Sequence, residues 1–252
     1  MGREPNTQMI GGLILALIAI CGCYVRPVQA QPLPETSVVF LVDMSASFAP
    51  LKVEDKQALE AVTQAVMQMA LEQWRHPVSF FWVKIGTSSI NAEPPCGRAM
   101  QYRPRLVEPG PRQNSGTGSE LFSREKLKAW FDVCILRLTR GKIPVDQYTD
   151  LSGAVQVATE SARGVRGLKV IIILSDFDED LPPGRPPVRF ALSSERVVMI
   201  YRPEPSDSKD PNLMLKRLVD WENRFKMAGA RDVCRIPVRG LLPGSVARCL
   251  TP

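Results

Sequence analysis

The sequence predicts an α/β fold, a doubly wound and mostly parallel central sheet with helices on both faces and one meandering edge. Two short apolar runs, at residues 38–42 and 170–174, are rich in β-branched residues and lack polar alternation. This pattern is typical of strands buried on both faces of a parallel sheet. Segments with helical spacing of apolar residues alternate with such runs along the chain, which favours double winding.

The first half of the chain continues this alternation. Apolar residues recur at helical spacing over residues 53–74, and His76-Pro77 ends the predicted helix. A strand is predicted at residues 78–85. Residues 86–120 are rich in Pro, Gly and Asn, which indicates turns and loops with room for a short strand near residues 102–107.

Two further helices are predicted before the second apolar run. Ser123 has the chemistry of an N-cap for a helix with Leu127, Phe131 and Leu138 on one face, and Gly141 ends that helix. The next helix is predicted to begin at Thr149.

The C-terminal part of the chain completes the pattern. An acidic, proline-rich loop is predicted at residues 176–187 and a strand at residues 196–201. The last long helix is predicted from Asp210-Pro211 to Gly229, with a capping residue at its start and glycine at its end. Residues 233–239 alternate in polarity and contain a proline, which an edge strand tolerates.

The N-terminus has the features of an export signal. Residues 9–23 carry no charge and are short for a membrane span of about 20 residues. Small residues before Gln31 predict cleavage there, although a lipoprotein box with Cys23 as the lipidated residue and an uncleaved membrane anchor stay open. We expect an exported protein of the periplasm or cell envelope. The expected divisions are a signal or anchor at residues 1–30, one domain at residues 31–240 and a C-terminal tail at residues 241–252.

Export changes the interpretation of the cysteines. Four of the six follow the signal, namely Cys96, Cys134, Cys234 and Cys249. An even number is consistent with two disulfides in an oxidising compartment. Three pairings are possible, and we favour Cys96–Cys134 and Cys234–Cys249 because the second pair would staple a C-terminal turn. No Cys-x-x-Cys spacing supports a zinc or redox site.

The charge of the chain gives little support to nucleic-acid binding. The formal net charge is +6, and residues 1–30 contribute two arginines and one glutamate to it, so their removal leaves +5. The basic residues are spread out and show no stripe interleaved with aromatic residues. We therefore expect a mild attraction to anionic partners or membranes and no nucleic-acid partner.

The candidate site consists of oxygen-bearing side chains. Asp43 and Asp176 each follow an apolar strand, and ligands of such sheets bind beyond the carboxyl ends of the strands where the strand order reverses. Ser45, Ser47 and Thr149 could join them. Five such oxygens suit a hard divalent cation such as Mg²⁺, with Mn²⁺ or Ca²⁺ as alternatives.

Each of these residues also has an ordinary structural explanation. Asp43 and its serines could cap a turn, Thr149 could be a helix N-cap, and Asp176 could be one more solvated acid. The joint pattern favours the metal site, because two carboxylates facing each other at a partly buried sheet end repel unless a cation or proton offsets them.

These residues carry a resemblance to a known family. Asp-x-Ser-x-Ser at residues 43–47, a Thr opening a helix at residue 149 and an Asp ending a strand at residue 176 resemble the metal-ion-dependent adhesion site of von Willebrand factor A-type (vWA) domains. The similarity would cover roughly residues 36–240. One departure is Phe177, since a small residue commonly follows that Asp in the family.

The resemblance implies a fold and a function. It implies an antiparallel edge strand within residues 86–120, and a cation-dependent domain for adhesion or assembly in the envelope. An acidic side chain of a protein partner would complete the metal shell. The alternative, from another class, is a metal-independent structural component of an envelope secretion or conjugation assembly.

The sequence gives little support to an enzyme. A phosphohydrolase of the haloacid-dehalogenase type is the less favoured alternative, because it needs a second acid where this chain has Ser45. His76, the only histidine, is best explained as a helix-terminal residue rather than a base. The glycines at residues 110–118 lack the Gly-Lys-Ser/Thr ending of a phosphate-binding loop.

Overall fold

The computed structural model describes residues 35–74, 76–103, 116–141, 143–203, 207 and 210–251. The expected signal or anchor at residues 1–30 lies outside these residues, as do residues 104–107 of the expected short strand. Within the described ranges, no helix combines the length and apolar character needed to cross a membrane.

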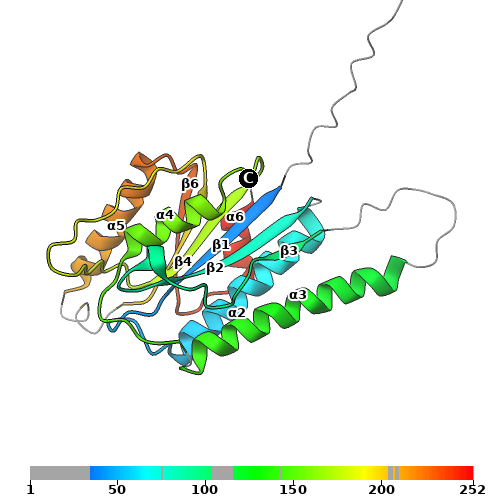
Figure 1. Cartoon of the computed structure of the whole chain (residues 1–252), viewed down its shortest axis with the longest axis horizontal. Helices are drawn as coiled ribbons and strands as arrows, with labels where there is room; N and C mark the ends of the chain where they lie inside the picture. The colour runs from blue at the N-terminus through cyan, green and yellow to red at the C-terminus, as the bar shows by residue number, and fades with distance from the viewer. Residues whose placement is uncertain are drawn as a thin grey trace, which may run out of the picture. The chain divides into compact units, whose positions relative to one another are not determined.

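Six strands form one sheet in the order β3-β2-β1-β4-β5-β6 (Figure 1). β3 pairs antiparallel with β2, and every other neighbouring pair is parallel. The fold class predicted from the sequence is therefore confirmed. The strands are β1 (Thr36–Asp43), β2 (Val78–Ile85), β3 (Met100–Tyr102), β4 (Lys169–Ser175), β5 (Arg196–Tyr201) and β6 (Asp232–Pro237).

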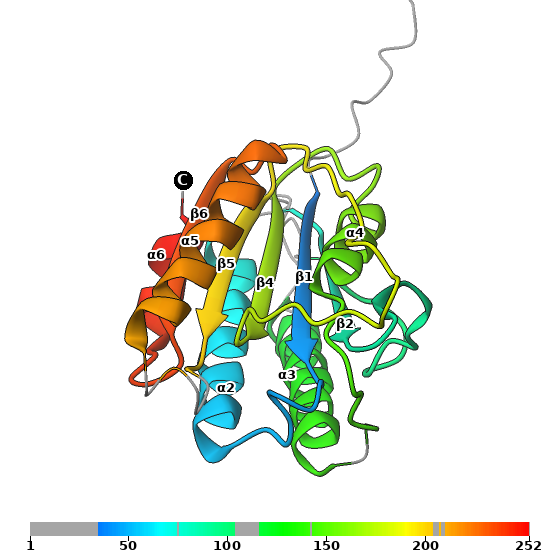
Figure 2. The same ribbon diagram turned by 90° about the vertical axis from the view of Figure 1, so that its left-hand side faces the viewer.

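Helices cover both faces of this sheet, and Figure 2 shows α4 and α5 in front of it with α2 and α3 behind. Val38, Phe40 and Val42 of β1 belong to the core with α2, α3 and α6, whereas Val39 and Leu41 belong to the core with α4 and α5. This alternation follows from the two-residue period of a strand. The helices are α2 (Val53–Gln68), which continues into a π-helical turn η1 (Met69–Gln73), the 3-10 turn η2 (Ser89–Asn91), α3 (Gly116–Thr139), α4 (Leu151–Ser161), α5 (Pro211–Met227) and α6 (Pro243–Leu250).

The α3 face of the core contains a cluster of aromatic rings. Phe40 stacks on Trp82 with ring centroids 4.4 Å apart, and Phe131 of α3 meets Phe40 edge-on at 5.7 Å. Such ring pairs contribute about 0.5–1.5 kcal/mol beyond the area they bury. They fix α3 against β1 and β2.

Two predicted boundaries are wrong. α3 begins at Gly116, not after Ser123, because glycines lower helix stability by about 1 kcal/mol each without forbidding a helix. α4 begins at Leu151 with Asp150 as its N-cap, so the prediction that it begins at Thr149 is off by two residues. Thr149 and Asp150 are both capping residue types, and the sequence does not separate them.

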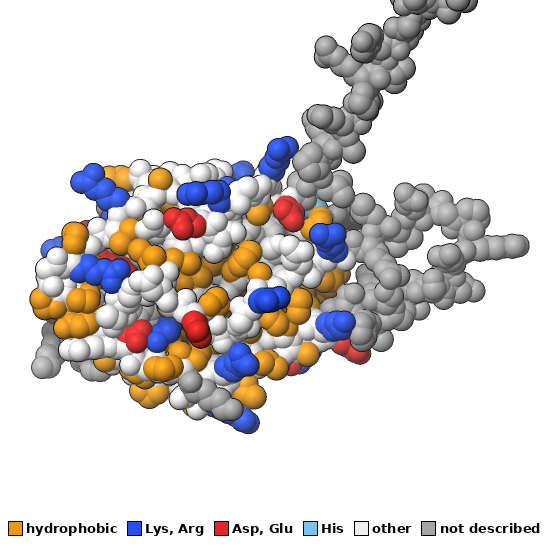
Figure 3. Space-filling view, in the orientation of Figure 1, with side chains coloured by type: hydrophobic (Ala, Val, Ile, Leu, Met, Phe, Trp, Pro, Cys, Tyr) orange, Lys and Arg blue, Asp and Glu red, His pale blue; other side chains and the backbone are white. Residues whose placement is uncertain are grey.

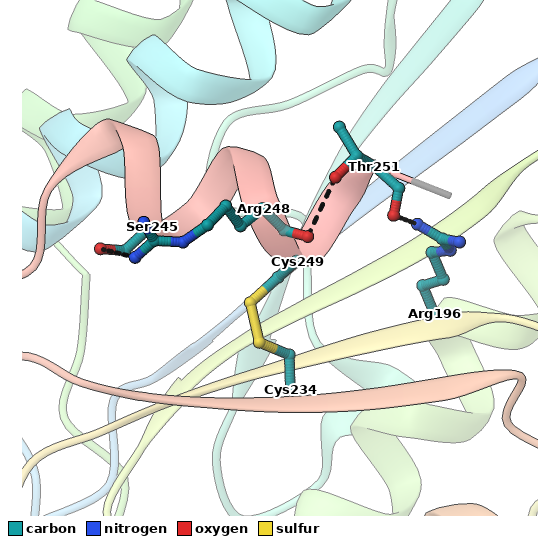
Figure 4. The surroundings of a disulfide bond; sticks show 6 residues. All are labelled: Arg196, Cys234, Ser245, Arg248, Cys249 and Thr251. Atoms are coloured by element: carbon teal, nitrogen blue, oxygen red, sulfur yellow. Dashed lines mark hydrogen bonds between the residues drawn. A yellow bond between two sulfur atoms is a disulfide. The ribbon is translucent and has the colours of Figure 1, made fainter.

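The segment expected to be a C-terminal tail contains the helix α6. Val246 and Leu250 are fully buried in the core. Figure 4 shows how α6 is attached: Cys249 is bonded to Cys234 of β6, and the Arg196 guanidinium donates a hydrogen bond to the carbonyl of Thr251. The short length of the segment and its Gly and Pro residues hid this helix in the sequence.

Both favoured disulfide pairings are present. Cys96 is bonded to Cys134 of α3 with a Cα–Cα distance of 5.2 Å, and Cys234 to Cys249 with a Cα–Cα distance of 5.9 Å. Disulfides persist in oxidising compartments, so the pairings agree with a location outside the cytoplasm.

The surface in Figure 3 mixes residue types. Lys and Arg side chains stand singly among apolar and other side chains on this face, without a continuous basic stripe. The face shown lacks the concentrated positive charge that nucleic-acid binding requires.

Removing the first disulfide should destabilise the domain. The double variant Cys96→Ala/Cys134→Ala opens a loop of 38 residues, and we expect it to lower the free energy of unfolding by about 2–4 kcal/mol. Urea unfolding without reductant measures the change. A double variant as stable as the oxidised wild-type chain would show that the bridge does not constrain the fold.

Candidate functional site

Asp43 lies where the strand order reverses. β1 is the central strand, with β2 on one side and β4 on the other, and a parallel sheet binds ligands at the carboxyl ends beside such a reversal. The register of β1 and β4 pairs Val42 with Leu174, which places Asp43 beside Ser175. The Ser175 hydroxyl donates a 2.6 Å hydrogen bond to Asp43 Oδ2. Asp43 is thus held at the shared edge of the two strands.

The first predicted segment, residues 43–47, folds back on Asp43. Ser45 donates to Asp43 Oδ1 twice, from its backbone N–H at 2.9 Å and from its hydroxyl at 2.6 Å. The Ser47 hydroxyl lies 3.2 Å from that of Ser45. Asp43 and Ser45 are buried while Ser47 is exposed, so the cluster reaches from the core to solvent.

The second predicted segment, which carries Thr149, joins the same edge. The Asp146 N–H donates to the Met44 carbonyl at 2.9 Å, which ties this segment to the first one. Asp150 caps α4 by accepting from the Gly153 N–H at 2.8 Å, so Thr149 is not the N-cap. The ordinary explanation of Thr149 as a helix cap is therefore removed, and its side chain is buried.

The third predicted segment begins at Asp176, directly after Ser175. Asp176 is buried, and its Oδ1 accepts a hydrogen bond from the Asp178 N–H at 3.0 Å. The carbonyl of Asp180 accepts from the Thr149 N–H at 2.7 Å. Hydrogen bonds therefore link the segments that carry all five predicted site residues, while the ligand set itself stays a prediction.

The electrostatics of Asp43 fit a cation. Burial raises the pKa of this carboxyl above its ordinary value, and the hydrogen bonds from Ser175 and Ser45 and the charge of Arg202 oppose that rise only in part. Arg202 is paired elsewhere, with Asp55 and with the Phe48 carbonyl. Within the described ranges no Lys or Arg forms an ion pair with Asp43, so a divalent cation would supply the missing positive charge.

The donor set is rich in hydroxyls. In the described part of the chain, no three His, Cys, Asp or Glu side chains gather as potential metal ligands. The predicted set contains two carboxylates and three hydroxyls, which are ligands suited to Mg²⁺ or Mn²⁺ rather than to a softer metal. The residues present are therefore compatible with a hard cation.

The strand order, with one antiparallel edge strand, is that of the fold that the sequence resemblance implies. The fold is vWA-like. A scan against models of known protein families found no match, and a search of curated protein sequences found none either.

Solved structures with similar folds differ widely in sequence. An aerotolerance-related membrane protein from Bacteroides fragilis is 10% identical with a TM-score of 0.42, covering 85% of this chain and 96% of that one. The manganese-loaded TRAP protein of Plasmodium vivax is 13% identical with a TM-score of 0.35, covering 86% of this chain and 62% of that one. The pilus adhesin SpaC from Lactobacillus rhamnosus GG is 13% identical with a TM-score of 0.33, covering 58% of this chain and 15% of the adhesin. These likenesses concern the fold alone.

Phe177 stands where a small residue is common in vWA domains. Its backbone nevertheless has the conformation that a small residue such as glycine favours. Its φ is +61°, in the left-handed region that glycine adopts without strain and that costs a bulky residue about 1–3 kcal/mol. The ring is buried in the core with α4 and α5, and the Phe177 carbonyl accepts a hydrogen bond from Trp221 Nε1 at 3.0 Å. Packing and this bond offset the strain.

Two residues of the site are not among those predicted from the sequence. Ser175 was not assigned a role, although its hydroxyl is the partner of Asp43 from the neighbouring strand. Glu179 belongs to the acidic loop predicted at residues 176–187, yet its side chain is only 10% exposed and pairs with Arg224 of α5. A hydroxyl at the end of a second buried strand is a usable signal for Ser175, whereas nothing local marks Glu179.

His76 lies away from these groups. Its Nε2 is 2.6 Å from the Thr36 hydroxyl at the start of β1, which is the opposite end of the strand from Asp43. The position agrees with the structural role expected for this residue.

The raised pKa of Asp43 predicts a reversal of stability between two conditions. In chelator, the wild-type chain loses stability as the pH rises from 3.8, the ordinary pKa of an Asp carboxyl, through the raised pKa of Asp43 in the folded state. The loss arises because the buried carboxyl must then ionise. Asp43→Asn should therefore be more stable than the wild-type chain at pH 7 in chelator, and the gap should narrow toward pH 4.

Saturating Mg²⁺ should reverse this order, because only the wild-type carboxylate gains a cation. Urea unfolding of both proteins at several pH values checks the ranking. A wild-type chain at least as stable as Asp43→Asn at pH 7 in chelator would contradict the electrostatic account of Asp43.

Proposed function

We propose that this chain binds a divalent cation, Mg²⁺ or in its place Mn²⁺ or Ca²⁺, and that the cation captures an acidic side chain of a protein partner. The proposed ligands are Asp43, Ser45, Ser47, Thr149 and Asp176. The observation that supports the proposal most is the buried Asp43 carboxylate, which three hydrogen bonds hold in place and with which no described Lys or Arg forms an ion pair.

The hydroxyls suit such a role chemically. By donating its proton to Asp43, the Ser45 hydroxyl keeps its lone pairs available for an ion. Hydroxyl ligands bring no charge, so a cation held largely by them remains attractive to an incoming carboxylate. The exposure of Ser47 leaves this side of the cluster open to a partner.

We place the protein in the cell envelope or periplasm. The two disulfides support an oxidising compartment, and the N-terminal sequence supports export. A partner for adhesion or assembly would then be another protein exposed to the same compartment. No nucleic acid is part of this proposal.

A hydrolytic role has less support from the site. A phosphohydrolase of the haloacid-dehalogenase type needs a general acid two residues after the first Asp, and that position holds Ser45, whose hydroxyl is hydrogen-bonded to Asp43 at 2.6 Å. A metal-independent scaffold remains the alternative function, and a cation titration separates it from the proposed one.

Cation binding should depend on the predicted ligands. Isothermal titration of the metal-free protein with Mn²⁺ or Mg²⁺ should show one site per chain. Asp43→Ala should abolish it, because both segments linked to Asp43 lose their shared acceptor. Thr149→Ala should weaken it, whereas Thr159→Ala, which removes a hydroxyl bonded only within α4, should not change it.

Partner capture gives a second measurement. Asp132→Asn, which removes an exposed carboxylate on α3, serves as the control for Asp43→Ala. In an affinity pull-down from an envelope fraction, chelator and Asp43→Ala should each release the same partner. A wild-type chain that shows neither heat nor a thermal shift with any of the three cations would favour the scaffold.

A further inference from the structure

The loop that carries Asp176 is attached to α5 by one hydrogen bond and two ion pairs. The Phe177 carbonyl accepts from Trp221 Nε1 at 3.0 Å, Asp178 lies 3.6 Å from Arg217, and Glu179 lies 3.2 Å from Arg224. The three α5 residues are spaced four and three positions apart, so they share one face of that helix. Each of the three loop residues after Asp176 therefore contacts the same helix face.

Glu179 makes the connection that matters most, because it also reaches α4. Its Oε2 accepts from Arg224 at 3.2 Å and its Oε1 accepts from the Ser152 N–H at 2.7 Å. Arg224 closes the triangle by donating to the Ser152 hydroxyl at 2.7 Å. The Arg224 guanidinium also lies 3.8 Å from the Trp221 ring centroid, which restricts its orientation.

This triangle lies next to two of the proposed metal ligands. Ser152 is three residues after Thr149, and Glu179 is three residues after Asp176. A second bond, from the Thr149 N–H to the Asp180 carbonyl at 2.7 Å, joins the same two segments. Two neighbouring attachments fix the spacing between segments more firmly than one.

We propose that Glu179 and Arg224 are a positioning pair that sets the separation of Thr149 from Asp176 for cation binding. The inference rests on the proposed function, since it assigns a role at the same site. Neither residue need contact the ion. Partners outside the ligand shell commonly change metal affinity by about 10–100-fold when they are removed.

The chain offers a matched control on the same helix. Glu222 of α5 pairs with Arg235 of β6 at 3.1 Å, with side-chain exposures of 18% and 36%. The Glu179–Arg224 pair has a distance of 3.2 Å and exposures of 10% and 34%. Arg235→Met therefore removes a comparable ion pair that touches neither Thr149 nor Asp176 segments.

The experiment measures Mn²⁺ affinity and amide exchange in the same set of proteins. Arg224→Met should raise the Mn²⁺ dissociation constant by about tenfold or more, and Arg235→Met should leave it unchanged. By hydrogen exchange, the Thr149 and Ser152 amides should exchange faster in Arg224→Met only, because both lose a firmly held acceptor. Arg224→Lys keeps the positive charge but lacks the planar guanidinium with its fixed donors. It should therefore bind Mn²⁺ more tightly than Arg224→Met and less tightly than the wild-type chain.

The outcomes separate the two proposals. If the wild-type chain binds Mn²⁺ and Arg224→Met binds it equally well, the positioning role is wrong while the proposed function stands. If Arg224→Met and Arg235→Met lose affinity equally, the effect is one of general stability and the positioning role is again wrong. A wild-type chain that binds no cation overturns the proposed function and this inference with it.

Discussion

The parallel pairing of β1 with β4 is the constraint on which the candidate site depends. It places Asp43 beside Ser175 at the point where the strand order reverses, and the 2.6 Å bond between their side chains closes the sheet edge there. A shift of one residue in this register would turn Asp43 away from Ser175. The apolar side chains that alternate between the two cores set the register, so the packing of the fold determines where the carboxylate lies.

The loops above this edge are fixed by buried ion pairs as well as by backbone bonds. Arg202 of the segment after β5 pairs with Asp55 of α2 and holds the Phe48 carbonyl, with its guanidinium 4.0 Å from the Phe48 ring centroid. Removing one partner of such a buried pair typically costs about 3–5 kcal/mol. Arg202 thus holds the loop after β1, through Phe48, and Arg224 holds the loop after β4, through Glu179. Under the proposed function, ligand oxygens on loops held in this way would need little rearrangement to surround an ion.

The sequence was sufficient for the parts of the structure that depend on local pattern. The apolar runs predicted β1 and β4, and helical spacing predicted most of α2 and α5, because strands and helices differ in the period of their buried residues. The set of five proposed ligands also came from pattern and sheet geometry, and it stays a prediction.

The parts that the sequence did not predict depend on tertiary contacts. Ser175 matters only because of the register with β1, and Glu179 only because Arg224, 45 residues later, reaches it. The helix α6 is short and takes its stability from the core and from the bridge to Cys234. Helices this short are marginal without tertiary packing, so local pattern does not reveal them.

A crystal structure of the Mn²⁺-soaked protein, with an anomalous difference map, tests the central claim most directly. The account predicts one strong peak at the carboxyl ends of β1 and β4, within bonding distance of the Ser45 and Ser47 hydroxyls and beside Asp43, Thr149 and Asp176. A fully occupied peak elsewhere, or no peak at saturating Mn²⁺, would contradict it.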